Sequence, residues 1–158
     1  MRLGAIQCAP LLAAAAALTS ASMSTEPTLR IAHASGGTLA IEIRNSSPRT
    51  LRLWKESNSW GAGRWRILRV RGGAIEVFFE NPNRVFTKNV PAYFEIVGEG
   101  SAEKAIDLND SDWRWRGGEE ASLIGGDLII VLYDVPATGE ASRMGVWYGI
   151  AATSVTIP

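Results

Sequence analysis

A pair of glycines, Gly72-Gly73, separates two runs with the composition of β-strands, Trp65–Arg71 and Ala74–Glu80. A two-residue hairpin loop of type I′ needs positive φ at both central residues, and glycine adopts such angles without a steric clash. The glycine pair therefore predicts a tight antiparallel hairpin. It constrains the fold more than any other feature of the chain because it fixes two strands and their pairing together.

The register of this hairpin follows from a two-residue loop. Arg69 then faces Glu76 as an opposite-charge pair, which we expect on the outer face. The expected buried face is formed by Leu68, Val70, Ile75 and Val77. Trp65 and Ile67 do not fit, because they share the parity of Arg69. We therefore expect either a bulge near Ile67 or a strand end that is covered on both faces.

Turn signals recur about every 8–12 residues along the rest of the chain, and no stretch after the N-terminus shows a helical period. This spacing predicts an all-β fold, and we expect an immunoglobulin-like antiparallel β-sandwich of about seven to nine strands. The Cys…Trp…Cys spacing of antibody domains is absent, so only the architecture is alike. The other expected strands are Leu29–Ala34, Thr38–Arg44, Thr50–Trp54, Ala92–Val97, Ala105–Leu108, Trp113–Arg116 and Asp127–Tyr133. Gly145–Ala151 and Thr153–Ile157 are expected to form the last strand or the last pair of strands.

The N-terminus has the pattern of a signal peptide. Arg2 precedes the apolar run Ala9–Leu18, and small residues follow up to Ser22. The run is shorter than the roughly 20 apolar residues of a membrane-spanning helix. We expect residues 1–22 to be a signal peptide and residues 23–158 to be a single exported domain, periplasmic or extracellular, without a membrane span after cleavage.

Charge is distributed unevenly between the two halves. Residues 30–88 contain 11 basic and 4 acidic residues, whereas residues 89–158 contain 4 basic and 11 acidic residues. The basic residues alternate along strands and do not form a tail, so we expect ion pairs between the halves and no nucleic-acid partner.

The residues that most enzymes use are scarce. His33 is the only His, and Cys8 lies in the expected signal peptide. We therefore expect no catalytic residues, no metal and no cofactor. The acidic residues of segment 107–120 leave calcium binding and a carboxylate-based hydrolase open as alternatives to a solvated turn. They are Asp107, Asp110, Asp112, Glu119 and Glu120.

Six Trp residues are many for a chain of this length. Trp60 lies in a polar, glycine-containing loop, between Asn58 and Arg64 in sequence, and Trp54 and Trp65 flank that loop. Exposed Trp residues with Asn and Arg neighbours are typical of binding surfaces. The alternative is that Asn58 caps the loop backbone while Trp60 covers one end of the sandwich. If so, Trp113 and Trp115 become the next candidates.

These observations predict a non-enzymatic domain that binds another macromolecule, in the manner of an adhesion or proteinase-inhibitor domain. The expected contact residues are Trp54, Asn58, Trp60, Arg64 and Trp65. A carbohydrate-binding module with Trp platforms is the alternative, so the partner is a protein or a glycan. We expect the protein to be a monomer.

Overall fold

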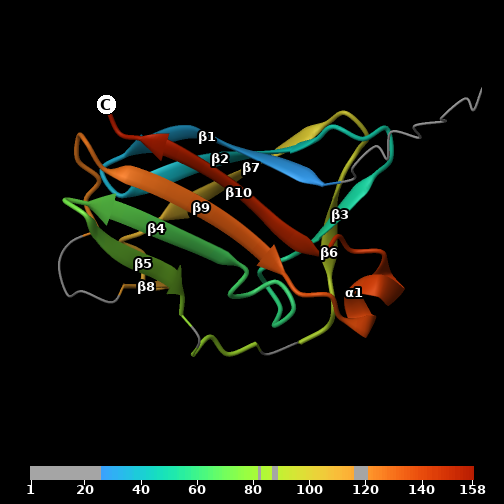
Figure 1. Cartoon of the computed structure of the whole chain (residues 1–158). Coiled ribbons are helices and arrows are strands. Elements are labelled where there is room, and N and C mark those ends of the chain that lie inside the picture. The colour runs from blue at the N-terminus through green and yellow to red at the C-terminus, as the bar shows by residue number, and fades with distance from the viewer. Residues whose placement is uncertain (1–25, 82, 87–88, 116–120) are drawn as a thin grey trace, which may run out of the picture.

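The computed structural model describes residues 26–81, 83–86, 89–115 and 121–158, and shows a β-sandwich built from antiparallel sheets (Figure 1). One layer is a three-stranded sheet in the order β1-β2-β7. The facing layer is a five-stranded sheet in the order β10-β9-β4-β5-β8, and a two-stranded sheet of β3 and β6 lies at one end. The expectation of a mostly β, antiparallel sandwich is confirmed.

The strands are numbered in chain order, and one helix lies between β9 and β10. Their bounds are β1 Pro27–Ser35, β2 Thr38–Asn45, β3 Leu51–Trp54, β4 Trp65–Arg71, β5 Ala74–Glu80, β6 Tyr93–Ile96, β7 Ser101–Asp107, β8 Trp113–Trp115, β9 Leu128–Val135 and β10 Gly149–Thr156.

The core lies between the two layers and is formed by alternate residues of each strand. In β2, Leu39, Ile41 and Ile43 point inward and are almost fully buried. Opposite them, Ile129 and Val131 of β9 are fully buried. This alternation is the pattern expected of strands with one face on a core.

The predicted hairpin register is confirmed, with Val70 opposite Ile75 and Arg69 opposite Glu76. The prediction of its faces is wrong. Ile75 is 66% exposed, whereas Arg69 is only 1% exposed. Trp65 and Ile67 are buried on the parity of Arg69, and their pairing runs without the expected bulge. The inward face therefore combines large apolar residues with one buried ion pair.

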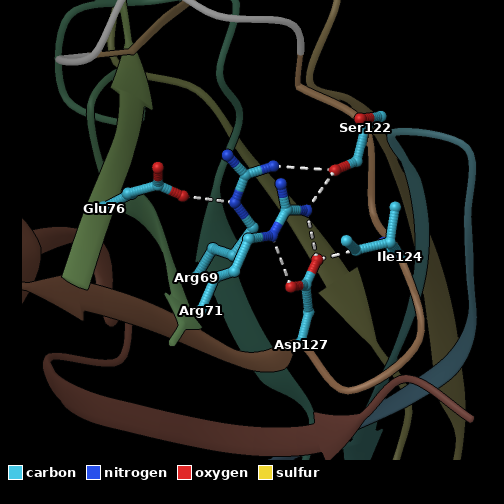
Figure 2. A network of polar contacts seen from close by, with 6 residues as sticks. All are labelled: Arg69, Arg71, Glu76, Ser122, Ile124 and Asp127. Atoms are coloured by element: carbon cyan, nitrogen blue, oxygen red, sulfur yellow. Dashed lines mark hydrogen bonds and ion pairs between the residues drawn. The ribbon is translucent and has the colours of Figure 1, made fainter. Parts of the chain in front are cut away.

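Arg69 is accommodated in the core because its guanidinium has polar partners on two sides (Figure 2). Its Nε donates to Glu76, and a second nitrogen donates to the carbonyl of Ser122 at 2.7 Å. Arg71 donates to the same carbonyl at 2.8 Å and forms a two-point ion pair with Asp127 at 2.6 and 2.7 Å. Asp127 also accepts from the backbone N–H of Ile124 at 3.0 Å. Because a buried charge needs such partners, this network ties the segment before β9 to the hairpin.

A short helix, α1 Gly139–Met144, lies where no helix was predicted, and β10 begins at Gly149 instead of Gly145. The helix has ordinary end signals: the Thr138 side chain accepts from the N–H of Ala141, and Gly145 ends it with a φ of 64°. The strand that was predicted to begin at Gly145 is therefore wrong at its start. A helix of six residues is too short to show a helical period in the sequence.

The two halves of the chain form ion pairs with each other, as predicted. Among the residues that the structure describes, these pairs are Arg52–Glu95, Glu56–Lys104, Arg66–Asp134, Arg71–Asp127 and Arg84–Asp112. Two of these pairs, Arg52–Glu95 and Arg66–Asp134, join neighbouring strands, and the other three involve a residue outside the strands. No helix in the described part of the chain is long and apolar enough to cross a membrane.

Candidate binding pocket

The loop between β3 and β4 is organised by Asn58, which is 1% exposed. Its Oδ1 accepts from the N–H groups of Trp60 and Gly61 at 3.0 and 3.1 Å, and its amide donates to the carbonyl of Ala92 at 3.1 Å. Gly61 is required, because an added Cβ would lie 2.1 Å from the carbonyl oxygen of Lys55. Asn58 therefore has the capping role that the sequence offered as the alternative to partner contact.

Trp60 is half-buried and packs against the core. Its ring centroid is 6.4 Å from that of Trp54, and its carbonyl accepts from Arg64 Nε at 2.7 Å. Trp54 and Trp65 are each 3% exposed. The loop thus lies folded over the end of the sandwich, and its Trp rings do not form an open platform.

Trp54 and Trp65 nevertheless line one pocket of about 250 Å³ at this end of the sandwich. Strands of both layers contribute to it, and Glu56 comes from the start of the loop. The complete lining is Ile43, Trp54, Glu56, Trp65, Phe94, Ala102, Glu103, Lys104 and Tyr133. Four of these nine residues are aromatic. Two of them, Trp65 and Tyr133, are in contact, with ring centroids 4.6 Å apart.

The polar side of this pocket is an ion pair between Lys104 Nζ and Glu56 Oε2 at 2.6 Å. Both side chains are about one-quarter exposed, at 25% and 26%. Lys104 lies on the inward parity of β7, between Ala102 and Ile106, and this places an ammonium group at the edge of the core. The pocket therefore offers a charged pair beside an aromatic wall.

Tyr133 is 2% exposed, and its hydroxyl oxygen has no hydrogen-bond partner among the described residues. Burial raises the pKa of Tyr133 above its ordinary value, and the nearby Glu56 carboxylate raises it further. The backbone of Trp54 lies close enough to the hydroxyl to lower this pKa, although the geometry is not that of a hydrogen bond, and burial has the larger effect. Tyr133 is therefore a neutral hydroxyl at neutral pH and cannot serve as a base there.

A second, more open pocket of about 480 Å³ is lined by residues of the same loop, of β4 and β5, and of the segment that follows β5. Glu80 contributes to it and is only 5% exposed. Its Oε2 accepts from the N–H of Gly63 at 2.7 Å, whereas Oε1 has no partner among the described residues. Burial raises the pKa of Glu80, and the Gly63 N–H opposes this shift.

The acidic segment has local roles where the structure describes it. Asp107 Oδ1 accepts from the N–H of Asn109, and Asp110 Oδ1 accepts from the N–H of Asp112, both at 2.9 Å. Glu119 and Glu120 lie outside the described residues. No group of three acidic, His or Cys side chains suited to a metal occurs within the described ranges.

The remaining sequence candidates lie apart from this pocket. Trp113 is 9% exposed in β8, and the side chain of Trp115 is not described. Sequence reasoning missed the other seven lining residues of the pocket, which are Ile43, Glu56, Phe94, Ala102, Glu103, Lys104 and Tyr133. Among the charged residues of this set, only Lys104 could have been placed near the core from the sequence, because it has the same parity in its strand as Ala102 and Ile106. No family model, curated protein or solved structure matched the chain.

Proposed function

We propose that this chain is an exported, non-enzymatic domain of immunoglobulin-like type that binds a partner protein, and that the aromatic pocket receives one side chain of that partner. The observation that carries the proposal is the pocket lined by Trp54, Trp65, Phe94 and Tyr133 with the Glu56–Lys104 pair at its side. Anchor side chains in desolvated pockets supply most of the binding energy of many protein interfaces.

The partner is a protein in this proposal because the Trp rings are covered. A glycan module of the platform type presents an open ring face, whereas Trp54, Trp65 and Trp113 are buried and Trp60 and Trp147 are half-buried. A volume of about 250 Å³ suits one side chain better than a sugar chain.

The non-enzymatic part of the proposal is supported by the carboxylates of the acidic segment. Asp107 and Asp110 hold backbone N–H groups of their own turn. Export is supported by the sequence pattern of residues 1–22, which lie outside the described residues.

A pair of matched substitutions on β7 tests the pocket. Ala102 is half-buried and lines the pocket, whereas Ala105 is exposed on the opposite parity of the same strand. Ala102→Trp fills the pocket, and Ala105→Trp adds the same ring to the surface. The partner is first captured by cross-linking the tagged protein in the exported fraction of its source cells.

Binding of that partner is then measured for both variants by surface plasmon resonance. We expect Ala102→Trp to weaken binding at least tenfold and Ala105→Trp to leave it unchanged, with both variants folded by circular dichroism. Equal affinity for both variants would show that the pocket is not the contact site.

A further inference from the structure

The outer face of the five-stranded sheet carries a grid of apolar side chains. Three rows cross four neighbouring strands, and the pairing of β10 with β9, β9 with β4 and β4 with β5 fixes each position. Written in the order β10, β9, β4, β5, the rows are Ala152-Leu132-Arg66-Phe79, Ser154-Ile130-Leu68-Val77 and Thr156-Leu128-Val70-Ile75. Arg66 is the one charged residue in the grid.

None of these twelve side chains is buried, although nine of them are apolar. An antiparallel sheet with one face in water normally carries polar residues there. A contiguous apolar face of this kind marks an interaction surface. This apolar face was not predicted from the sequence, because the apolar residues of β4 and β5 were expected to point into the core.

The sizes of the side chains at the two edges of the grid are complementary. Consider a twofold axis that runs parallel to the strands, between β4 and β9. It places β9 of one copy over β4 of the other, and β10 over β5. The outward residues of β10 are small and those of β5 are large, so Ala152, Ser154 and Thr156 face Phe79, Val77 and Ile75 of the second copy. Such small-to-large matching lets two sheets pack at about 10 Å.

The charges at the end of the grid are complementary under the same axis. Arg66 and Asp134 lie on the adjacent strands β4 and β9 and form a loose pair at 3.6 Å. Their side chains are 54% and 34% exposed, so both can reach a second molecule. Under this axis, Arg66 of each copy lies over β9 of the other copy, which is the strand that carries Asp134. The whole chain has 16 basic and 16 acidic residues, so two copies meet without net repulsion.

The size of the grid indicates the strength of such a contact. Four strands about 4.8 Å apart and three rows about 6.7 Å apart cover about 400 Å² per copy. Both copies together bury about 800 Å², which is below the roughly 1,000 Å² of a stable interface and is compatible only with weak, transient association. We propose that two copies of this chain associate face to face through this grid, as a twofold dimer held by apolar packing and by reciprocal Arg66–Asp134 pairs. This dimer replaces the monomer that we expected from the sequence, and its association is expected to be weak and reversible.

Sedimentation velocity over a concentration series that extends to about 1 mM, where weak complexes still form, tests the apolar part of the interface. Ile75 and Val97 are exposed to similar extents, 66% and 68%, but Val97 lies outside the grid. We expect Ile75→Lys to weaken dimerisation at least tenfold, and Val97→Lys to leave it unchanged. A wild-type protein that remains monomeric throughout this range overturns the proposal, as does a dimer that Ile75→Lys does not weaken.

Mixing two charge variants tests the axis itself. Arg66→Asp places two acidic groups at this end of the grid, and Asp134→Arg places two basic groups there, so each variant alone should be monomeric. An equimolar mixture should dimerise, because each copy then meets opposite charges on the other. An intramolecular role for the pair cannot produce this rescue. If each variant dimerises as well alone as in the mixture, the proposed axis is wrong.

Discussion

A substitution of Trp60 tests whether the loop between β3 and β4 contacts a partner or covers the end of the sandwich. Truncation of a fully buried Trp to Ala costs about 3–5 kcal/mol. Trp60 keeps part of its surface in water, so its burial contributes less than this range, roughly 2 kcal/mol. Loss of the ring contact with Trp54, at 6.4 Å, adds about 0.5–1 kcal/mol. We therefore expect Trp60→Ala to lower the free energy of unfolding by about 2–3 kcal/mol.

Urea denaturation followed by far-ultraviolet circular dichroism measures this loss without depending on Trp fluorescence. Tyr148→Ala is the control, because Tyr148 is 52% exposed and its truncation should change stability by less than about 0.5 kcal/mol. If Trp60→Ala is as mild as the control, Trp60 does not cover the core, and direct contact between its ring and a partner becomes the better explanation.

Three further substitutions probe buried polar groups in this structure. Tyr133→Phe should leave stability unchanged or raise it by about 1 kcal/mol in urea denaturation, because it removes a buried hydroxyl without a partner; a clear loss would reveal a hidden hydrogen bond. The pKa of Asp127 is lowered mainly by its hydrogen bonds with Arg71, so its carboxylate stabilises the fold above its unfolded pKa. Asp127→Asn should therefore cost roughly 2–3 kcal/mol at pH 7, with a deficit that shrinks below about pH 4; a deficit independent of pH contradicts the ion pair. Burial raises the pKa of Glu80, so the wild-type protein loses stability as pH rises through that folded-state value. Glu80→Gln still accepts a hydrogen bond from the Gly63 N–H. This variant should have a higher melting temperature than the wild type at pH 7 and the same melting temperature in acid. A lower melting temperature at pH 7 would show that the charge of Glu80 is stabilising.

The sequence was informative where chemistry is local. Gly72 and Gly73 have φ of 56° and 85°, and the strand register that they predicted is confirmed along the whole hairpin. The general β architecture also followed from turn spacing. Both features depend on residues that are close in sequence, so no tertiary information was needed to predict them.

The side of the sheet could not be predicted in the same way. Leu68 and Val70 alternate with Arg69 and Arg71, and apolar residues are normally placed inward. Arg69 lies inward because Glu76, fixed by the hairpin, and the carbonyl of Ser122, distant in sequence, satisfy its guanidinium. Only the fold brings that carbonyl within reach. Trp65 and Ile67 were the sequence evidence for the correct side, and they were interpreted as an irregularity.

The pocket was only partly predictable for the same reason. Trp54 and Trp65 were singled out because they flank a loop, and the structure places both in the pocket wall. Phe94, Lys104 and Tyr133 come from three other strands, and nothing local to them indicates a shared pocket. Strand order across two layers brings them together, and that order was not predicted from the sequence.

The most direct test of the central claim, that the aromatic pocket accepts a side chain, is the nuclear magnetic resonance spectrum of the indole N–H groups. The probe is 4-methylphenol, which carries the ring and hydroxyl of a Tyr side chain. A fragment of this size should bind with a dissociation constant on the order of 1 mM. We expect saturable shifts of the Trp54 and Trp65 resonances in the wild-type protein, no shift of Trp113, and no saturable shift in Ala102→Trp. Shifts that are absent in the wild type, or equal in Ala102→Trp, would contradict the account.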